Sequence, residues 1–265
     1  MQEQRTGLLS MDNLELLSIR NQSQAFPEHY HESFCISFIR SGVETLKMDT
    51  GSIYSPAGTI SLTNPYEIHA NPIESGEQDL SFDTLYLSQE LVDHYLKAKK
   101  SSFYQRVYRD AELLEGFEQI KQALIQPLFA EQLENSLVEF LQLLNRSEKS
   151  GKNVHPVSLH AKWSELILYI ERHLHRKLSL EMLAGFLHMD KYHFSREFRR
   201  KFGMSPINYV LMKKVFAAKK QICADSELTG IAYDFSFADQ AHFSKTFKKF
   251  IGISPNSYKK MLLKN

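Results

Sequence analysis

A stretch of seventeen residues occurs twice near the C-terminus, and it restricts the fold more than any other feature of the chain. Residues 193–209 read HFSREFRRKFGMSPINY and residues 242–258 read HFSKTFKKFIGISPNSY, at a constant offset of 49. Eight of the seventeen positions are identical, and three more exchange Arg for Lys. In each copy two phenylalanines four residues apart share one face of a helix, and the basic residues lie off that face. Each copy therefore predicts an amphipathic helix with a cationic outer side.

Signals around each copy predict a helix-turn-helix unit. Gly203 and Gly252 are expected to end the two helices, and the Ser-Pro pair after each glycine is expected to start the next helix. A shorter amphipathic helix is predicted before each copy, over residues 180–187 and 228–235. A short helix, a tight turn and a longer basic helix form the unit that places its second helix in a major groove of DNA. The duplication therefore indicates two DNA-reading units in one chain.

The same arrangement resembles the DNA-binding domain of the AraC/XylS family of transcription regulators, with a match over residues 159–260. Its most specific part is the stretch IAYDFSFADQAHFSKTFKKFIGISPNSYKK, residues 231–260. The family usually has Gly where this chain has Ser236, and we expect the serine to adopt the left-handed turn conformation at modest cost. Pro206 is expected to open a long helix that joins the two units and fixes the distance between them.

Base-reading side chains are expected at the front of each long helix, on the side away from the phenylalanines. The resemblance implies the same positions, which are Tyr192, Ser195, Arg196, Gln240, His242, Ser244 and Lys245. Arg196 suits a guanine edge and Gln240 an adenine edge. Basic residues one turn later are expected to contact phosphates instead, namely Arg199, Arg200, Lys248 and Lys249. The alternative for any one basic residue is a solvated surface charge.

The charge distribution favours a polyanionic partner for the C-terminal half. The net charge of +1 hides an asymmetry between the two halves. From Leu159 onward there are 19 Lys/Arg and 9 Asp/Glu, a net charge of +10, which leaves 13 basic and 22 acidic residues, or −9, in residues 1–158. A basic domain of this kind is typical of nucleic-acid binding, so double-stranded promoter DNA is the expected partner.

Neither a disulfide framework nor a membrane segment is predicted. The two cysteines, Cys35 and Cys223, lie in different halves of the chain, which fits a reducing cytoplasm. The start MQEQRTGLLSMDNLELL lacks the basic and apolar regions of a signal peptide. No apolar run approaches the ~18 residues of a membrane-spanning helix. We therefore expect a cytoplasmic protein without membrane contact.

The N-terminal half reads as many short strands followed by helices. Between residues 14 and 87, β-prone runs such as FCISFI alternate with turn signals such as PAG at 56–58 and NP at 64–65. This punctuation is typical of a small barrel or jelly roll. Together with the helical C-terminal half it predicts the α+β class in two domains, residues 1–145 and 159–265, with a polar linker at residues 146–158.

A histidine-rich segment stands among these predicted strands. Its order resembles the cupin-type ligand-binding domain of many AraC-family proteins, over residues 20–90. His29, Tyr30 and His31 match the H-x-H stretch, and the PAG at 56–58 matches the P-x-G turn. Histidines at i and i+2 point to the same side of a strand. We predict a polar pocket lined by His29, His31 and His69 that binds an organic effector of the amino acid or sugar class. The alternative is that these histidines are structural.

Three imidazoles are also a ligand set for a transition metal. Metallo-cupins add a carboxylate shortly after H-x-H, but Glu32 is adjacent to His31 and would point the opposite way on a regular strand. His69 also lies far beyond Gly58, where the second cupin motif would place it closer. We therefore expect an organic ligand and no metal or other cofactor, with metal binding as the alternative.

Two apolar helical stripes follow the predicted barrel. The second consists of Leu133, Leu137, Phe140, Leu141 and Leu144. Such a stripe packs on the barrel of its own chain or forms the seam of a dimer. Because the stripe is able to form such a seam, we expect a homodimer.

The sequence thus predicts a ligand-responsive transcription regulator that binds promoter DNA. The resemblance implies RNA polymerase as a further partner and favours activation over repression. Two rivals remain, a metal-dependent cupin enzyme with a nucleic-acid-binding tail and a dimeric DNA-binding protein that senses nothing. The predicted activity is not enzymatic.

Overall fold

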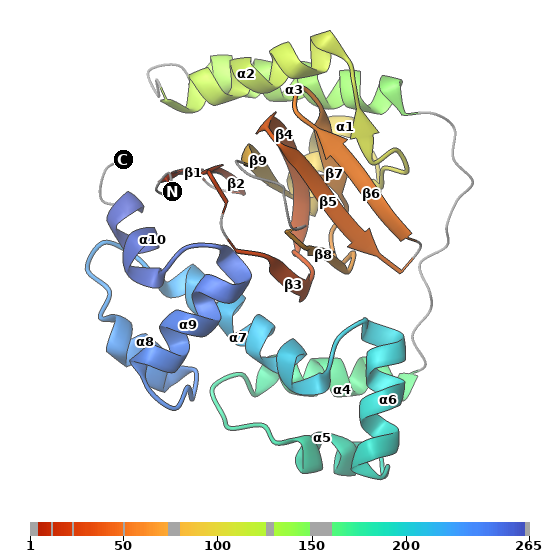
Figure 1. Cartoon of the computed structure of the whole chain (residues 1–265), viewed down its shortest axis with the longest axis vertical. Helices are drawn as coiled ribbons and strands as arrows, with labels where there is room; N and C mark the ends of the chain where they lie inside the picture. Colours follow the sequence, from red (N-terminus) through yellow and green to blue (C-terminus); the bar gives the residue numbers. More distant parts are fainter. Residues whose placement is uncertain are drawn as a thin grey trace. The chain divides into compact units, whose positions relative to one another are not determined.

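The computed structural model of the chain, drawn in Figure 1, describes residues 5–11, 13–22, 24–49, 51–73, 80–125, 130–148 and 161–262. The chain divides into two compact units, one of residues 1–153 without Phe26–His29 and one of residues 154–264 with that segment. Phe26–His29 is nevertheless strand β3 of a sheet in the first unit. The predicted α+β class, with a sheet-rich N-terminal part and a helical C-terminal part, is confirmed.

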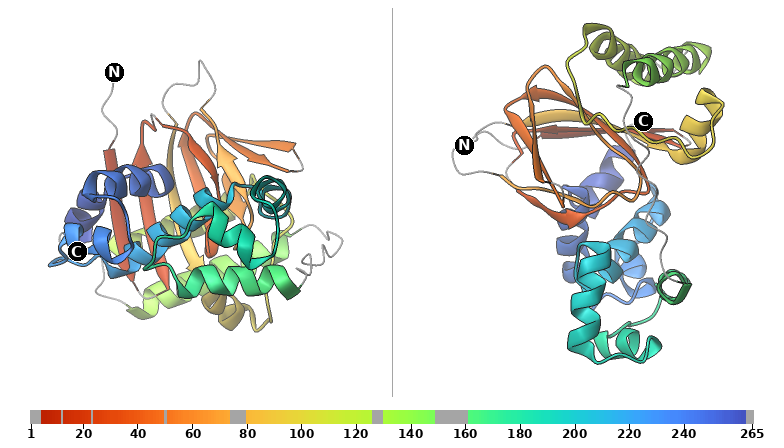
Figure 2. Two further views of the ribbon diagram at one scale, coloured as in Figure 1. Left: turned by 90° about the horizontal axis from the view of Figure 1, so that it is seen from below. Right: turned by 90° about the vertical axis from the view of Figure 1, so that its right-hand side faces the viewer.

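The N-terminal unit contains two sheets, which Figure 2 shows from two further directions. A six-stranded sheet has the order β1-β2-β9-β4-β7-β10, and a four-stranded sheet has the order β3-β8-β5-β6. The strands are β1 Arg5–Met11, β2 Leu14–Arg20, β3 Phe26–His29, β4 Ser33–Ser41, β5 Val43–Met48, β6 Gly51–Pro56, β7 Ile60–Thr63, β8 His69–Asn71, β9 Ser81–Ser88 and β10 Val107–Tyr108.

The central strands β4 and β9 alternate between an apolar and a polar face. Ile36 pairs with Leu85 in the antiparallel register, and both belong to the hydrophobic core. The next pair, Ser37 and Thr84, points to the other face, and the two buried hydroxyls are hydrogen-bonded at 2.7 Å. Successive side chains of a strand point to opposite faces, so one face packs on helices and the other is polar.

Three helices cover the apolar face, namely α1 Gln89–Leu96, α2 Ala111–Ile125 and α3 Ala130–Ser147. Helices α2 and α3 lie side by side in Figures 1 and 2. Every residue of the predicted second stripe, from Leu133 to Leu144, is buried in this core. The stripe therefore packs within its own chain, and the idea that it forms an exposed dimer seam is wrong. Of the predicted linker, Arg146 and Ser147 instead end α3, and residues 149–158 lie outside the described residues.

The carboxylate of Asp83 on β9 joins the sheet to α2. It is fully buried and accepts hydrogen bonds from Arg20 at 2.6 Å, from Arg40 at 2.7 Å and from the Lys121 Nζ on α2 at 2.8 Å. Burial opposes ionisation, but the hydrogen bonds from Lys121, Ser18 and Arg20 hold the pKa of Asp83 below its ordinary value. Since the three cations compensate one buried carboxylate, this cluster has a structural role.

The C-terminal unit consists of α4 Ala161–Arg172, α5 Leu180–Phe186, α6 Lys191–Phe202, α7 Pro206–Gln221, α8 Leu228–Asp234, α9 Gln240–Ile251 and α10 Pro255–Leu262. Gly203 ends α6 with φ 66° and Gly252 ends α9 with φ 88°, as predicted. Ser205 caps α7, which has Pro206 in its first turn. Helix α7 packs against α5 and α6 of the first unit of the duplication and against α8 and α9 of the second. Within the described part of the chain, no helix combines the length and the apolar character needed to span a bilayer.

Candidate nucleic-acid interface and ligand site

Helix α6 buries its phenylalanines and exposes its predicted DNA-contacting side chains. Phe194 and Phe198 are fully buried, and their rings pack on Trp163 of α4 with centroid distances of 6.0 and 6.1 Å. The opposite side is open to solvent, with Tyr192 71% exposed and Arg196 also exposed. Ser195 is half-buried, and the two predicted phosphate contacts, Arg199 and Arg200, are exposed. The helix therefore has one apolar and one cationic side, as the sequence predicts.

Helix α9 repeats this division. Phe243 and Phe247 are fully buried, and the exposed side carries Gln240, His242, Lys245 and Lys249. Ser244 and Lys248 are half-buried. All eleven predicted contact residues thus lie off the buried faces of α6 and α9.

Several of these side chains contact neighbouring groups. The Thr229 hydroxyl of α8 donates to the Gln240 Oε1 at 3.0 Å, so the amide NH₂ of Gln240 is left as its donor end. The Ala238 N–H donates to the His242 Nδ1 at 3.5 Å. Arg200 forms an ion pair with Glu197 on its own helix at 2.8 Å. The carboxylate of Glu197 reduces the attraction that Arg200 exerts on a phosphate.

The turns that connect the helices of each unit are alike. His188 between α5 and α6 has φ 53°, and Ser236 between α8 and α9 has φ 51°. Ser236 thus adopts the left-handed conformation that the sequence predicts, and its hydroxyl donates to the His175 carbonyl at 2.7 Å. The serine therefore replaces the usual glycine and contributes a hydrogen bond.

The N-caps of α6 and α9 were missed by sequence reasoning. Asp190 accepts hydrogen bonds from the Tyr192 and His193 N–H groups at 2.8 and 3.3 Å. Asp239 accepts one from the His242 N–H at 2.6 Å. Both positions are related by the offset of 49, and the preference for Asp at an N-cap would have found them.

Two lysines of α7 are buried, which helical periodicity also fails to predict. The Lys214 Nζ donates to the Arg176 carbonyl at 2.9 Å and to the Phe235 carbonyl at 2.7 Å. Burial lowers the pKa of Lys214 to about 8. Lys213 forms an ion pair with Glu171 of α4 at 2.7 Å. Through these contacts α7 is held to α4, to the segment that follows α4, and to the turn between α8 and α9.

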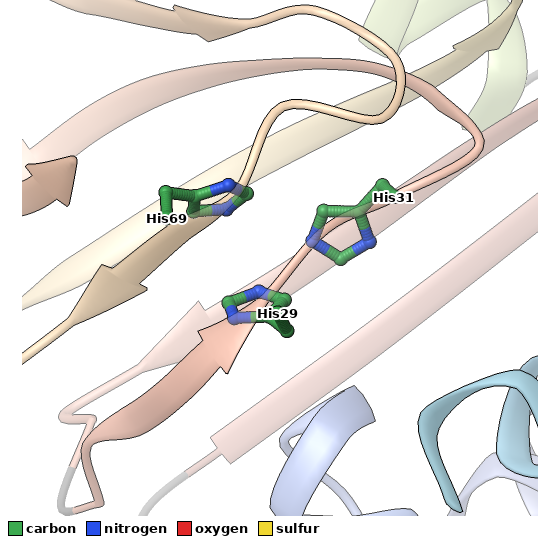
Figure 3. A group of neighbouring side chains, drawn as sticks. All are labelled: His29, His31 and His69. Carbon is green, nitrogen blue, oxygen red and sulfur yellow. The ribbon is translucent and has the colours of Figure 1, made fainter. Parts of the chain in front are cut away.

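In the N-terminal unit the three predicted ligand-site histidines lie together (Figure 3). The ligand atoms of His29, His31 and His69 all lie within 4.8 Å of one another. His29 ends β3, His31 follows it, and His69 begins β8, the neighbouring strand of the same sheet. The long sequence separation was an argument against His69 as a member of the site. The pairing of β3 with β8 nevertheless brings His69 next to His29.

Backbone carbonyls orient two of the rings. The His29 Nδ1 lies 2.7 Å from the Pro27 carbonyl oxygen, and the His69 Nδ1 lies 2.9 Å from the Glu67 carbonyl oxygen. Burial lowers the pKa of His69 to about 4, so this ring is neutral at pH 7. Three imidazoles at this spacing are able to hold a transition metal ion, and they can also contact an organic ligand. Glu32 is not part of the cluster, as the sequence predicts.

A second polar group in this unit was missed by sequence reasoning. Glu44 of β5 is buried, accepts hydrogen bonds from the Ser61 hydroxyl and from the Asn71 Nδ2 at 3.1 Å, and its pKa is raised to about 7 by burial. Ser55 lies opposite Glu44 in the β5–β6 register, and its hydroxyl is buried without a hydrogen-bond partner among the described residues. We call the buried side chains between the two sheets the polar layer, which consists of Ser37, Glu44, Ser55, Ser61, Asn71 and Thr84. The alternation of VETLKM could have marked Glu44 as inward-facing.

The polar layer continues to the histidines through Tyr86 of β9. The ring centroids of His31 and Tyr86 are 5.2 Å apart, and those of His31 and His69 are 5.6 Å apart. Burial, followed by the charges of Cys35, Glu15 and Glu44, raises the pKa of Tyr86. Buried polar groups in such number are costly unless they bind one another or a ligand.

Comparisons with known proteins match the N-terminal and the C-terminal parts of the chain to two different domains. The AraC-like ligand binding domain matches residues 13–141, and a helix-turn-helix domain matches residues 183–261. The uncharacterized HTH-type transcriptional regulator YbfI of Bacillus subtilis is 23% identical over 227 residues, which cover 82% of each protein. The bifunctional transcriptional activator/DNA repair enzyme AdaA of Bacillus subtilis is 34% identical over 71 residues, which cover 26% of this chain and 34% of that protein.

Solved structures show the same fold over the whole chain. ToxT from Vibrio cholerae has a TM-score of 0.59 at 14% sequence identity, and the match covers 95% of this chain and 99% of that chain. At 14% sequence identity this comparison shows a shared fold and nothing further. Both the sheet-rich unit and the helical unit are included in it.

Proposed function

Because the chain belongs to the AraC/XylS family of transcription regulators, we propose that it is a ligand-responsive activator that reads two adjacent major grooves of promoter DNA. The observation that carries this proposal is the matched pair α6 and α9. Each helix buries its phenylalanines and turns its cationic side to solvent. Helix α7 packs against both helix-turn-helix units of the duplication. A helix of this kind fits a major groove, where its front residues meet base edges.

The division of labour on DNA follows from position along each helix. Residues at the front of the helix and off the buried face are the proposed base readers, which are Tyr192, Ser195, Arg196, Gln240, His242, Ser244 and Lys245. Residues one turn later are the proposed phosphate contacts, which are Arg199, Arg200, Lys248 and Lys249. Since Gln240 already accepts from Thr229, its amide NH₂ is the group offered to a base acceptor.

The proposed effector is a small polar molecule that binds near His29, His31 and His69 and reaches the polar layer. A solved structure of ToxT has an unsaturated fatty acid bound. In this chain the Glu44 carboxyl accepts hydrogen bonds from Ser61 and Asn71, and the polar layer offers further oxygen acceptors, so a ligand that presents hydrogen-bond donors fits. Sugars and amino acids offer such donors, through hydroxyl and amino groups.

The mode of regulation and the assembly are further parts of the proposal. Activation is supported by the name of AdaA, a transcriptional activator that is 34% identical over 71 residues. An activator needs RNA polymerase as a partner and works where the promoter is, in the cytoplasm. A homodimer would place two such readers on one promoter, although the stripe on α3 is not its seam. The rival cupin enzyme is disfavoured, because both matched domains are those of a regulator.

Selection of bound sites from a random duplex pool tests the proposal. The full chain should enrich one sequence and, in a footprint, protect roughly two helical turns, because adjacent major grooves on one face are about 34 Å apart. An effector should then change occupancy or spacing on that site. Enrichment of no sequence at low salt would contradict the proposal.

A further inference from the structure

The three histidines converge in a way that an organic pocket does not require. Their ligand atoms lie within 4.8 Å of one another, and Figure 3 shows the three rings turned towards a common region between β3 and β8. Imidazole nitrogens bind Zn²⁺ at about 2.0–2.1 Å, so two ligands of one ion are at most about 4.2 Å apart. In a tetrahedral site the nitrogens come to about 3.4 Å from one another, and side-chain rotations of these three neighbouring rings would bring their ligand atoms from within 4.8 Å to that distance.

The tautomers of two rings suit metal ligation. A carbonyl oxygen only accepts, so the contacts at Pro27 and Glu67 place the proton of each neutral ring on the Nδ1 of His29 and His69. The lone pair then lies on the Nε2 of both rings. Ligating histidines in proteins are oriented in this manner, with the other nitrogen donating to a carbonyl or carboxylate.

A second layer of contacts holds these positions. The Tyr66 N–H donates to the His31 carbonyl at 2.7 Å, which joins the segment before His69 to the segment that carries His31. The Glu67 side chain accepts from the Asn64 N–H at 3.0 Å and from the Arg106 guanidinium at 2.5 Å. The carbonyl that orients His69 is therefore itself anchored, and support of this kind preorganises a metal site.

Burial adds to this preorganisation. His29 is 2% exposed and His69 4% exposed, whereas His31 is half-buried and leaves the cluster accessible. Three protein ligands satisfy an open site, in which a further coordination position remains for water or another molecule. Imidazole ligands suit first-row ions such as Zn²⁺, Co²⁺, Fe²⁺ and Ni²⁺.

We propose that His29, His31 and His69 bind a divalent first-row transition metal ion. The proposal rests on the proposed function, because it names the first ligand of the same sensory site. The imidazoles then hold the ion, and an effector meets the open coordination position instead of the rings themselves. It replaces the expectation of a metal-free pocket, which rested on the sequence distance of His69 and on the lack of a suitably placed carboxylate after the H-x-H stretch.

Titration of the untagged full chain with Co²⁺ tests this proposal. After treatment with a chelator, the chain should bind one Co²⁺ with visible d–d absorption, and Zn²⁺ should displace it. His31→Ala and His69→Ala should each lower the association constant by more than about 100-fold. The matched control is His94→Ala, an exposed histidine on α1, which should bind as the unchanged chain does.

Thermal unfolding without metal shows whether each variant is folded. If His69→Ala does not fold, His31→Asn decides, because His31 is half-buried. Binding of less than about a tenth of an equivalent of Co²⁺, or equal binding by a folded His31 variant, would overturn the proposal and leave the histidines as packed rings. DNA binding is measured on the same preparation. If DNA is bound and Co²⁺ is not, only the metal proposal fails, and if DNA is not bound at low salt, the proposed function fails.

Discussion

At the scale of single residues, the carboxyl of Glu44 makes the N-terminal unit sensitive to pH. Its pKa is raised from 4.5 to about 7 by burial, so between these values the folded chain binds more protons than the unfolded chain. The free energy of unfolding should therefore fall as the pH rises from 4.5 to 7.

Glu44→Gln should remove this dependence and stabilise the N-terminal unit at pH 7.5 by up to about 3 kcal/mol. The relevant readout is the calorimetric transition that occurs without a change in Trp163 fluorescence, because the one tryptophan of the chain lies in the C-terminal unit. Ser52→Ala, at an exposed position on the adjacent strand β6, is the control and should keep the pH dependence. Equal pH profiles for Glu44→Gln and the unchanged chain would contradict this account.

Two arginines of α6 should differ in what they contribute to DNA binding. Arg196→Ala should cost about 1–3 kcal/mol on the selected site and relax the preference at one base pair. Arg199→Ala should weaken selected and random DNA alike and flatten the dependence on salt by about one unit of slope. Binding of both variants to both duplexes over a salt series checks this, and equal losses would show that the division into base readers and phosphate contacts is wrong.

At the scale of elements, the amphipathic helices of the C-terminal unit were predictable and its buried charges were not. The spacing of Phe194 and Phe198 and the glycine at 203 predicted α6, because periodicity and capping are local properties. Lys214 looks like a surface residue in the sequence. Its burial depends on two carbonyls, those of Arg176 and Phe235, that only the tertiary fold brings to it.

Lys214 should give the C-terminal unit a characteristic pH profile. Its folded pKa of about 8 lies below its ordinary value of 10.5, so between these values the unfolded chain binds more protons. The free energy of unfolding should rise as the pH increases from 8 to 10.5, and Lys214→Met should lose this rise. Urea unfolding followed by Trp163 fluorescence measures it. Lys220→Met, an exposed position on the same helix, should keep the rise, and a rise retained by Lys214→Met would refute the assignment.

The stripe on α3 should behave as core. Leu137 is 4% exposed, so Leu137→Glu should destabilise the N-terminal unit by at least about 3 kcal/mol through lost packing and a buried charge. Gln142→Glu, exposed on the same helix, should have little effect. Thermal unfolding and sedimentation of both variants distinguish the two roles. A Leu137→Glu chain that keeps its stability would contradict this core role.

The sequence singled out the three histidines that lie together in the N-terminal unit, but it did not predict their geometry. The H-x-H spacing identified His29 and His31, and the downstream His69 was included on resemblance. Its proximity depends on the pairing of β3 with β8, and strand pairing is not local in sequence. The polar layer was missed for the same reason, since Ser61 and Asn71 meet Glu44 from two other strands.

At the scale of the whole molecule, one chain of the proposed regulator reads two adjacent major grooves. The basic C-terminal half, with a net charge of +10 from residue 159 onward, supplies non-specific attraction to any duplex. In the proposed function, specificity comes from α6 and α9 together, because each presents its own set of front residues. Changes in DNA sequence should therefore alter the specific part of the affinity and leave the non-specific part unchanged, whereas a change in salt concentration alone does not separate the two.

The most direct measurement is the affinity of the full chain for the selected site with either half scrambled. At one fixed salt concentration, scrambling either half should lower the association constant, and scrambling both should lower it to the level of random DNA. A site in which only one half matters would contradict the reading of two grooves by one chain. Equal affinity for all four duplexes would contradict sequence-specific binding altogether.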